Sequence, residues 1–327
     1  MKICIYGAGA IGGFIGARLA ACGVSVAAVA RGATAEALRT RGWRLQTPGG
    51  VASWPTAGVS PNPSELGAQD LVVVAVKAPA LAAVAAGIAP LLAPHTVVLT
   101  AMNGVPWWFF EGVSGAHAGM QLDAVDPGGR IAAAIPAQHV VGCVVHATCS
   151  TPEPGLVRHG FGQRLVLGEP RGGASARLES LVGLLCKAGF DAEASMHIQQ
   201  DIWYKLWGNM TMNPVSALTG ATCDRILDDP LVRRFCLDVM AEAKAVGERI
   251  GCSIEQSGED RNAVTRKLGA FKTSMLQDVE AGRPIELDAL VTVVHEIGCK
   301  LGIATPNIDA LLGLVRLQAQ VRGLYPA

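Results

Sequence analysis

Apolar runs of two kinds alternate through the first half of the chain. Short runs of strand length are separated by longer runs whose apolar positions recur at helical spacing, and both kinds end at Gly, Pro or polar residues. The pattern predicts strands over residues 2–6, 24–30, 71–76, 96–100, 139–148 and 164–168, and helices over 12–22 and 80–92. Residues 42–63 are predicted to form short strands and loops, and residues 155–162 a turn-rich segment. This order is typical of a doubly wound α/β sheet.

The strand patterns fade after a Gly- and Pro-containing segment at residues 169–173, which is the best candidate for a linker. Long helical patterns follow, over residues 174–188, 198–217, 230–250, 261–281, 286–301 and 307–321. Because 327 residues exceed one typical domain, we expect an α/β domain over residues 1–170 and an all-α domain over residues 171–327.

A glycine motif follows the first predicted strand directly. In Gly-x-Gly-x-x-Gly, the first glycine permits a tight turn, the second lets the backbone approach a pyrophosphate, and the third lets the helix pack on the strand. Glycine accounts for 39 of the 327 residues, so the motif alone is weak evidence, but the strand before it and the helix after it make it specific. A Rossmann-type domain is therefore predicted, with these residues at the dinucleotide: Gly7, Ala8, Gly9, Ala10, Ile11 and Gly12.

The end of the second strand indicates which dinucleotide binds. An NAD site usually has an acidic residue there to bind the ribose 2′-OH, but this chain has Arg31 and no carboxylate before Glu36. A guanidinium matches phosphate oxygens, so NADP(H) is favoured, although Arg31 could also be an ordinary solvated loop residue. Lys77 follows the strand over 71–76, at the edge where open α/β sheets bind ligands; it could equally just begin a loop.

Charge and composition exclude several classes of function. Lys plus Arg and Asp plus Glu both number 27, and no basic stripe suggests nucleic acid. No apolar run reaches the roughly 20 residues that span a bilayer, and no signal peptide is evident, so we expect a cytoplasmic protein without a membrane partner. The nine cysteines include no Cys-x-x-Cys pair and are expected to be reduced core residues, with no metal site.

A polar stripe stands out in the predicted helix over 198–217. Lys205, Asn209, Asn213 and Ser216 are spaced 4, 4 and 3 residues apart among Trp and Met, so they share one helix face. Amides in apolar surroundings are typical of groups that orient a small ligand in a pocket. The alternative is a set of buried amides that satisfy backbone groups. Pro214 is expected to bend or break this helix.

Two further polar positions attract attention. Glu286 stands at the start of a predicted helix, where a carboxylate is more often a first-turn residue than an active one. Asn103 follows the strand over 96–100 and could anchor substrate or nicotinamide, but Asn-Gly is also an ordinary tight turn.

Over nearly its whole length the chain resembles the ketopantoate reductase (2-dehydropantoate 2-reductase) family. The motifs that carry the resemblance are Gly7-x-Gly9-x-x-Gly12-Gly13, Arg31, Lys77, Asn103-Gly104, Lys205-Leu206-x-x-Asn209-x-x-x-Asn213-Pro214, and Ser274-Met275-x-Gln277-Asp278 with Glu286 and Asp288 behind. In that family NADPH reduces the keto group of a small branched 2-keto acid, a step of pantothenate synthesis.

The resemblance also implies roles for individual residues. Lys205 would be the general acid with Glu286 beside it, and the substrate would be held by Asn103, Asn209, Asn213 and Ser274. Asn103 and Glu286 would also contact the cofactor. The NADP-binding domain would be residues 1–170 and the substrate and catalytic domain residues 171–327, with the pocket between them and a closing motion about residues 169–173.

The chain departs from the family pattern after the Asn-Gly turn. Four consecutive aromatics, Trp107, Trp108, Phe109 and Phe110, are not expected to be entirely buried in one strand or helix face. They could narrow the pocket, admit a bulkier 2-keto acid or form a homodimer contact, or they could be a core patch. Residues 112–130 are expected to be a flap or an edge loop. A reductase of another 2-keto acid and a non-catalytic NADP-sensing protein therefore stay open as alternatives.

Overall fold

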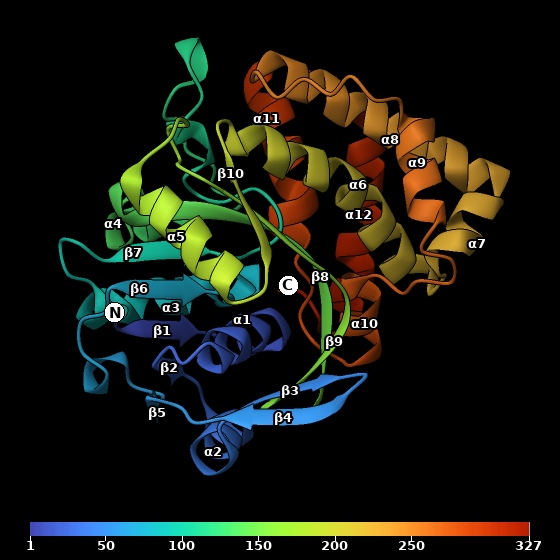
Figure 1. The fold of residues 1–327 in the computed structure, drawn as a ribbon. Helices are drawn as coiled ribbons and strands as arrows, with labels where there is room; N and C mark the ends of the chain where they lie inside the picture. Colours follow the sequence, from blue (N-terminus) through green and yellow to red (C-terminus); the bar gives the residue numbers. More distant parts are fainter. Residues whose placement is uncertain (327) are drawn as a thin grey trace. The chain divides into compact units, whose positions relative to one another are not determined.

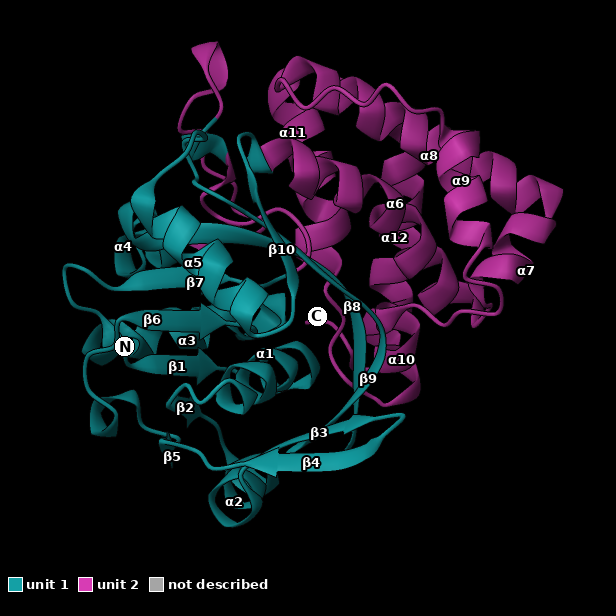
Figure 2. Cartoon of the chain, in the orientation of Figure 1, with its two compact units in different colours: residues 1–102, 110–112, 128–198 teal, residues 103–109, 113–127, 199–327 magenta. Residues whose placement is uncertain are grey.

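The computed structural model describes residues 1–326 and divides into two compact units (Figure 2). Unit 1 comprises residues 1–102, 110–112 and 128–198, and unit 2 comprises residues 103–109, 113–127 and 199–327. Residues 171–198, which we placed in the second domain, pack with unit 1 because their strand pairs with its sheet. Residues 103–109, which we placed in the first domain, pack with unit 2.

Unit 1 is built on one sheet with the strand order β4-β3-β9-β8-β7-β6-β1-β2-β5, and β10 pairs with β9 (Figure 1). The strands are β1 (Ile3–Tyr6), β2 (Val26–Val29), β3 (Trp43–Thr47), β4 (Gly50–Trp54), β5 (Gly58–Ser60), β6 (Leu71–Val74), β7 (Val97–Thr100), β8 (Val140–Glu153), β9 (Leu156–Gly168) and β10 (Asp191–Ser195). Strands β5, β2, β1, β6, β7 and β8 run parallel in consecutive pairs. This confirms the doubly wound α/β prediction for this part of the chain.

The prediction of a turn-rich segment over residues 155–162 holds only at its start. Gly155 lies in the turn between β8 and β9, but residues 156–162 belong to β9, which forms a long antiparallel hairpin with β8. Gly160 and Gly162 lie where the register between the two strands shifts, and β-bulges accept glycine readily.

Helices pack on the sheet of unit 1: α1 (Ala10–Ala21), α2 (Gly32–Arg41), α3 (Leu81–Gly87), α4 (Arg130–Ala134) and α5 (Ala176–Lys187). The mostly polar α2 was not predicted, because only three of its residues are buried and its apolar pattern is weak. The helix expected over 80–92 is shorter, since Pro79 and Pro90 stand in 3₁₀ turns on either side of α3.

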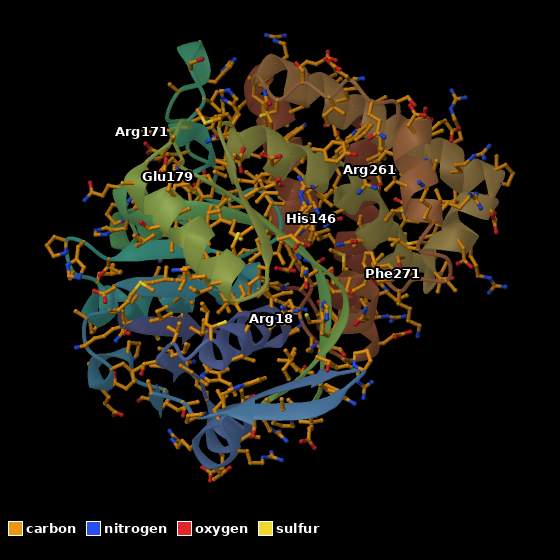
Figure 3. The ribbon with its side chains drawn as sticks, viewed as in Figure 1. Arg18, His146, Arg171, Glu179, Arg261 and Phe271 are labelled. Atoms are coloured by element: carbon orange, nitrogen blue, oxygen red, sulfur yellow. The ribbon has the colours of Figure 1, made fainter. Side chains whose placement is uncertain are left out.

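One arginine joins several elements of unit 1. Arg18 of α1, labelled in Figure 3, donates hydrogen bonds to the Gly189 carbonyl (2.8 Å) and to Gln163 (3.1 Å). Its guanidinium lies over the Phe14 and Phe190 rings. The helix is thereby fixed to the hairpin and to the segment after α5.

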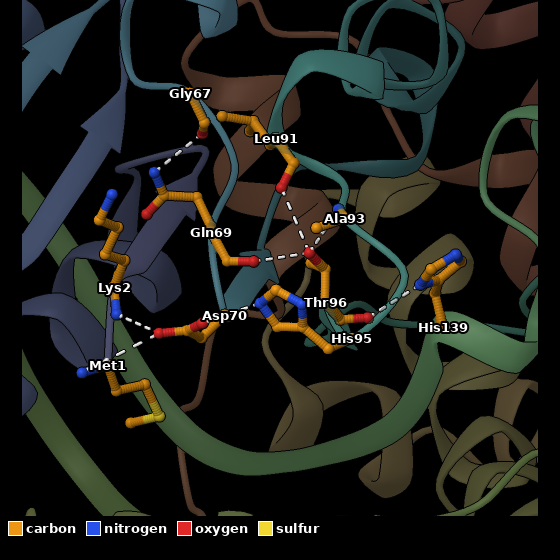
Figure 4. A network of polar contacts seen from close by, with 10 residues as sticks. All are labelled: Met1, Lys2, Gly67, Gln69, Asp70, Leu91, Ala93, His95, Thr96 and His139. Atoms are coloured by element: carbon orange, nitrogen blue, oxygen red, sulfur yellow. Dashed lines mark hydrogen bonds and ion pairs between the residues drawn. The ribbon is translucent and has the colours of Figure 1, made fainter.

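The amino end of the parallel strands is held by a polar network (Figure 4). Asp70 accepts hydrogen bonds from the Lys2 amide (2.6 Å) and pairs with His95 (3.0 Å), and Thr96 donates to the Gln69 carbonyl (2.6 Å). His139 bonds the Thr96 carbonyl at 2.9 Å. These contacts join neighbouring chain segments, so His95 and His139 serve the fold.

Unit 2 is helical: α6 (Ile198–Thr219), α7 (Cys223–Asp228), α8 (Pro230–Arg249), α9 (Gly258–Arg266), α10 (Ser274–Glu280), a π-helical turn (Asp288–Thr292), α11 (Val293–Leu301) and α12 (Pro306–Val321). The helix predicted over 261–281 is two helices, because Thr273 caps a new one at α10. Pro214 does not break α6, whose residues 210–217 are all buried, so packing outweighs the lost backbone bond. Among residues 1–326 no helix combines the length and the apolar character that crossing a membrane requires.

The cysteines partly contradict the expectation. All nine are free thiols, as predicted, but Cys22, Cys186 and Cys299 are exposed and are not core residues. The described residues contain no cluster of His, Cys, Asp or Glu that could hold a metal ion.

A partly buried ion pair anchors the segment that follows β9. The Glu169 carboxylate accepts hydrogen bonds from Arg177 Nε (2.8 Å), Arg177 Nη2 (2.5 Å) and Ser175 Oγ (2.5 Å). Burial by itself raises the pKa of Glu169, but the bonds from Arg177 and Ser175 outweigh it and hold the pKa below its ordinary value.

We therefore expect the stability of the protein to depend on Glu169 in acid. A depressed native pKa contributes stability above the unfolded pKa of about 4.3, and that stability is lost as the pH falls through the native pKa. Glu169→Gln should lower the free energy of unfolding at pH 7 by about 1–3 kcal/mol and should flatten its decline below pH ~4.3. Denaturant melts across pH measure this, with the exposed Glu179→Gln as control; equal acid sensitivity of wild type and Glu169→Gln would contradict it.

Candidate active site

The three glycines of the first turn differ in what a side chain would meet. A Cβ on Gly7 would lie 2.6 Å from Val76 Cγ1, and its backbone has a φ of +101°. A Cβ on Gly12 would lie 2.1 Å from the Gly7 carbonyl oxygen. A Cβ on Gly9 would have no neighbour within 4 Å. The fold thus requires glycine at positions 7 and 12, whereas the open space at Gly9 suits the close approach of a ligand.

Helix α1 begins directly after this open position. Gly9 is its N-cap residue and supplies no side-chain cap, so the first backbone N–H groups of α1 point out of the helix start. Such N–H groups, with the positive end of the helix dipole, suit a phosphate. The residues of this turn therefore fit a dinucleotide pyrophosphate.

Arg31 and Lys77 follow the two strands that flank β1. Arg31 is the exposed N-cap residue of α2 after β2, and Lys77 is the exposed residue before a 3₁₀ turn after β6. Because the chain passes to opposite sides of β1 at β2 and β6, this is the switch point of the sheet, where open α/β sheets bind ligands. Burial raises the pKa of the Tyr6 phenol, and the positive charge of Arg31 offsets part of that rise.

Within unit 2 the Lys205 amine is held by Asn103. Lys205 Nζ, on α6, donates a hydrogen bond to Asn103 Oδ1 at 2.8 Å, and both side chains are half-buried. The two residues are 102 positions apart. The structure therefore brings together two residues that the sequence singled out separately.

The aromatic run explains how Asn103 reaches α6. Phe109 packs its ring 6.0 Å from the Trp203 ring, and Gln199 Nε2 donates to the Phe109 carbonyl at 3.2 Å. All four aromatics are buried, with exposed fractions between 0% and 9%, but they lie in a turn and a 3₁₀ turn and not on one strand or helix face. They form a core patch, so the run offers no exposed apolar surface for a homodimer contact.

A second contact fixes the turn around Asn103. Val105 N donates to the Ala289 carbonyl at 3.0 Å, and a Cβ on Gly104, whose φ is +83°, would lie 2.2 Å from that same oxygen. Asn103-Gly104 is therefore a tight turn, and it is also the turn that presents Asn103 to Lys205. Glu286 lies three residues before Ala289 and is 7% exposed.

The other predicted substrate residues have different surroundings. Asn209 is half-buried and Asn213 is buried, one and two turns after Lys205 on α6, while Ser274 is exposed at the first turn of α10. Ser216 does not belong to a ligand-binding stripe, because its hydroxyl donates to the Ala221 carbonyl at 2.8 Å and closes the end of α6.

An arginine that sequence reasoning missed packs against α6 at Gly208, three residues after Lys205. Arg261 of α9, labelled in Figure 3, lies over the Tyr204 ring. A Cβ on Gly208 would come within 2.3 Å of Arg261 Nη2. Burial lowers the pKa of Arg261. Gly208 thus admits α9 close to α6, a role that no local pattern signals.

The segment over residues 113–127 is tied to unit 2. Glu296 of α11 accepts hydrogen bonds from the Asp123 and Ala124 amides at 2.9 and 2.8 Å. The expected edge loop therefore has a specific anchor.

This arrangement of the amine suits proton transfer to oxygen. A lysine ammonium has three donors, and Asn103 orients it by accepting one of them. An oriented ammonium can stabilise negative charge that develops on an oxygen and can then protonate it.

Comparison with known proteins identifies the chain's relatives. Residues 3–107 match the family described as "Ketopantoate reductase PanE/ApbA", and residues 197–319 match "Ketopantoate reductase PanE/ApbA C terminal". A 2-dehydropantoate 2-reductase of Mesorhizobium japonicum is 47% identical over 99% of this chain and 100% of its own length.

Solved structures agree. A crystal structure from Ralstonia solanacearum MolK2, assigned as a ketopantoate reductase, is 64% identical and has a TM-score of 0.95 over 99% of both chains. A D-mandelate dehydrogenase solved with NADH and anilino(oxo)acetate has a TM-score of 0.84 over 99% of this chain and 100% of its own; at 22% identity this likeness shows the fold alone. The chain thus belongs to the ketopantoate reductase family of pyridine-nucleotide-dependent oxidoreductases, which act on CH–OH groups.

Proposed function

We propose that this protein reduces 2-dehydropantoate to pantoate with NADPH, a step of pantothenate synthesis, and that Lys205 is the general acid. The names of the relatives support the substrate, because the Mesorhizobium japonicum protein is a 2-dehydropantoate 2-reductase. The observation that carries the mechanism is the hydrogen bond from Lys205 Nζ to Asn103 Oδ1 at 2.8 Å.

The residues present fit the cofactor. The open space at Gly9 and the start of α1 would accept the pyrophosphate, and Arg31 would pair with the 2′-phosphate of NADPH. Lys77, Asn103 and Glu286 are further candidates for cofactor contacts. When bound, NADPH would supply the hydride.

The chain's own side chains would manage charge and protons. Reduction of a ketone carbon leaves negative charge on its oxygen, and Lys205 would stabilise that charge and then donate the proton that completes the hydroxyl group. Asn103 would orient the amine, and Asn209, Asn213 and Ser274 would bind the substrate's carboxylate and hydroxyl through neutral groups. Glu286 would lie beside Lys205, where its carboxylate would favour the protonated form of the amine.

The direct test is a steady-state assay that follows NADPH absorbance with 2-dehydropantoate and bulkier 2-keto acids. We expect the highest kcat/KM with 2-dehydropantoate. The buried aromatic run gives no support to a preference for bulkier acids. NADPH binding without turnover of any acid would instead support a sensor.

Lys205→Ala should abolish most turnover without weakening the binding of NADPH. Loss of a positioned general acid typically lowers kcat by about 10²–10⁴-fold, while the dissociation constant for NADPH should change little. Stopped-flow turnover and NADPH fluorescence titration measure the two effects. Lys272→Met, at an exposed ion pair with Glu280, is the control and should keep full activity; an active Lys205→Ala protein would remove the lysine from the mechanism.

Arg31→Ala should change the choice of dinucleotide. A charged hydrogen bond contributes about 1.5–3 kcal/mol, so affinity for NADPH should fall on the order of 10- to 100-fold while affinity for NADH stays unchanged. Titration of both dinucleotides checks this, with Arg39→Ala elsewhere on α2 as control. An equal loss of affinity for NADPH and for NADH would mean that Arg31 does not contact the 2′-phosphate.

Two glycine variants separate binding from folding. Gly9→Ala adds a methyl group that meets no protein atom, so the protein should melt at the wild-type temperature yet bind NADPH more weakly. Gly12→Ala forces a contact with the Gly7 carbonyl and should lower the melting temperature by itself. Calorimetry and titration of both variants measure the effects, and unchanged NADPH affinity in Gly9→Ala would argue against pyrophosphate at this turn.

A further inference from the structure

The C-terminal residues of unit 2 hold the segment that carries Glu286. Leu324 is buried, its amide donates to the Ala319 carbonyl at the end of α12 (2.8 Å), and its own carbonyl accepts from the Ile285 amide (3.2 Å). The residue next to Glu286 is therefore fixed by backbone contact with the tail of the chain.

Tyr325 makes a second contact on the other side of Glu286. Its hydroxyl donates to Asp288 Oδ1 at 2.5 Å, and Thr292 Oγ1 donates to the same oxygen at 3.0 Å. Burial, then the bond to Asp288, raise the pKa of Tyr325 far above its ordinary value, so the phenol stays protonated and remains a donor.

Asp288 begins an irregular part of the helix. Residues Asp288–Thr292 form a π-helical turn, in which the Val293 amide reaches back to the Asp288 carbonyl. Such turns are rare and occur often at functional sites. Here both hydroxyl groups converge on the first side chain of the turn, so they hold it in place.

The π-helical turn also contacts the residues around the amine. Ala289, the residue after Asp288, accepts the Val105 amide and lies against Gly104, and the preceding Asn103 accepts the hydrogen bond from Lys205. A continuous series of contacts therefore runs from Tyr325 through Asp288 and Ala289 to the Asn103 turn and Lys205, with Glu286 between the two tail contacts.

We propose that Tyr325 is a positioning residue of the reductase site, which acts through Asp288 to hold Glu286 and the Asn103 turn against Lys205. The inference rests on the proposed function. It assigns a role in turnover to the tail of the chain, which supplies none of the predicted substrate or cofactor contacts.

The test is kcat of Tyr325→Phe, which removes one hydroxyl and keeps the ring. A small displacement of reacting groups can cost up to about 100-fold, and we expect kcat to fall about 10-fold or more with the dissociation constant for NADPH unchanged. Tyr204→Phe is the matched control: Tyr204 is the other tyrosine of unit 2, its hydroxyl bonds Gln256 Oε1 at 2.7 Å, and its loss should leave kcat unchanged.

Double variants separate positioning from mere stability. If Tyr325 acts through Asp288, Tyr325→Phe should add no loss of kcat to Asp288→Ala. If it acts on the amine, it should add none to Lys205→Ala. A loss of kcat that is the same in every background and follows the melting temperature would overturn the proposal, as would wild-type kcat in Tyr325→Phe.

The same assays distinguish the two claims. Wild-type protein that does not reduce 2-dehydropantoate refutes the proposed function, and the positioning role then falls with it. Active wild type with an equally active Tyr325→Phe protein refutes only the role of the tail.

Discussion

One hydrogen bond, from Lys205 to Asn103, gives the candidate site its geometry. The two residues lie 102 positions apart, so their meeting is a tertiary event that several other contacts make possible. Buried aromatics place the Asn103 segment on α6, and the Ala289 carbonyl fixes the turn that presents it. An ammonium that is oriented before substrate arrives loses less entropy in the reaction than a free one, and this is the physical reason why such support matters for catalysis.

The glycines of the first turn serve two different purposes. At positions 7 and 12 glycine is required because the backbone of neighbouring elements already occupies the space of a side chain. At position 9 no protein atom lies within reach, so the missing side chain leaves room for something outside the chain. The space around each glycine therefore distinguishes the two that the fold itself requires, Gly7 and Gly12, from Gly9, which leaves room for a ligand. The sequence motif does not show this difference.

Much of the remaining polar chemistry supports these two sites from a distance. Arg261 of α9 packs on Gly208 of α6, Glu296 binds the loop around Asp123, and the tail residues brace the helix start after Glu286. Glu296 and Tyr325 have defined hydrogen-bond partners, whereas Arg261 combines a bond to Thr265 and the Tyr204 ring with a buried Nε that has no hydrogen-bond partner among the described residues. The segment that carries the candidate residues is therefore connected to parts of the chain that carry no recognisable motif.

The sequence by itself determined the α/β order, the glycine turn and the likeness to ketopantoate reductases, because hydrophobic period and turn chemistry are local, and it singled out Lys205 and Asn103 as candidates. It missed α2, whose apolar face is small, and took residues 156–162 of β9 for turns because Gly160 and Gly162 lie where the strand register shifts. It also left open what the aromatic run does and took Ser216 for a pocket residue. Only the tertiary structure decided that the aromatic run is buried, that Ser216 closes the end of α6, and that Asn103 and the tail belong to one helical unit. Most such contacts join residues that are far apart in the chain, and they produce no periodic pattern in the sequence.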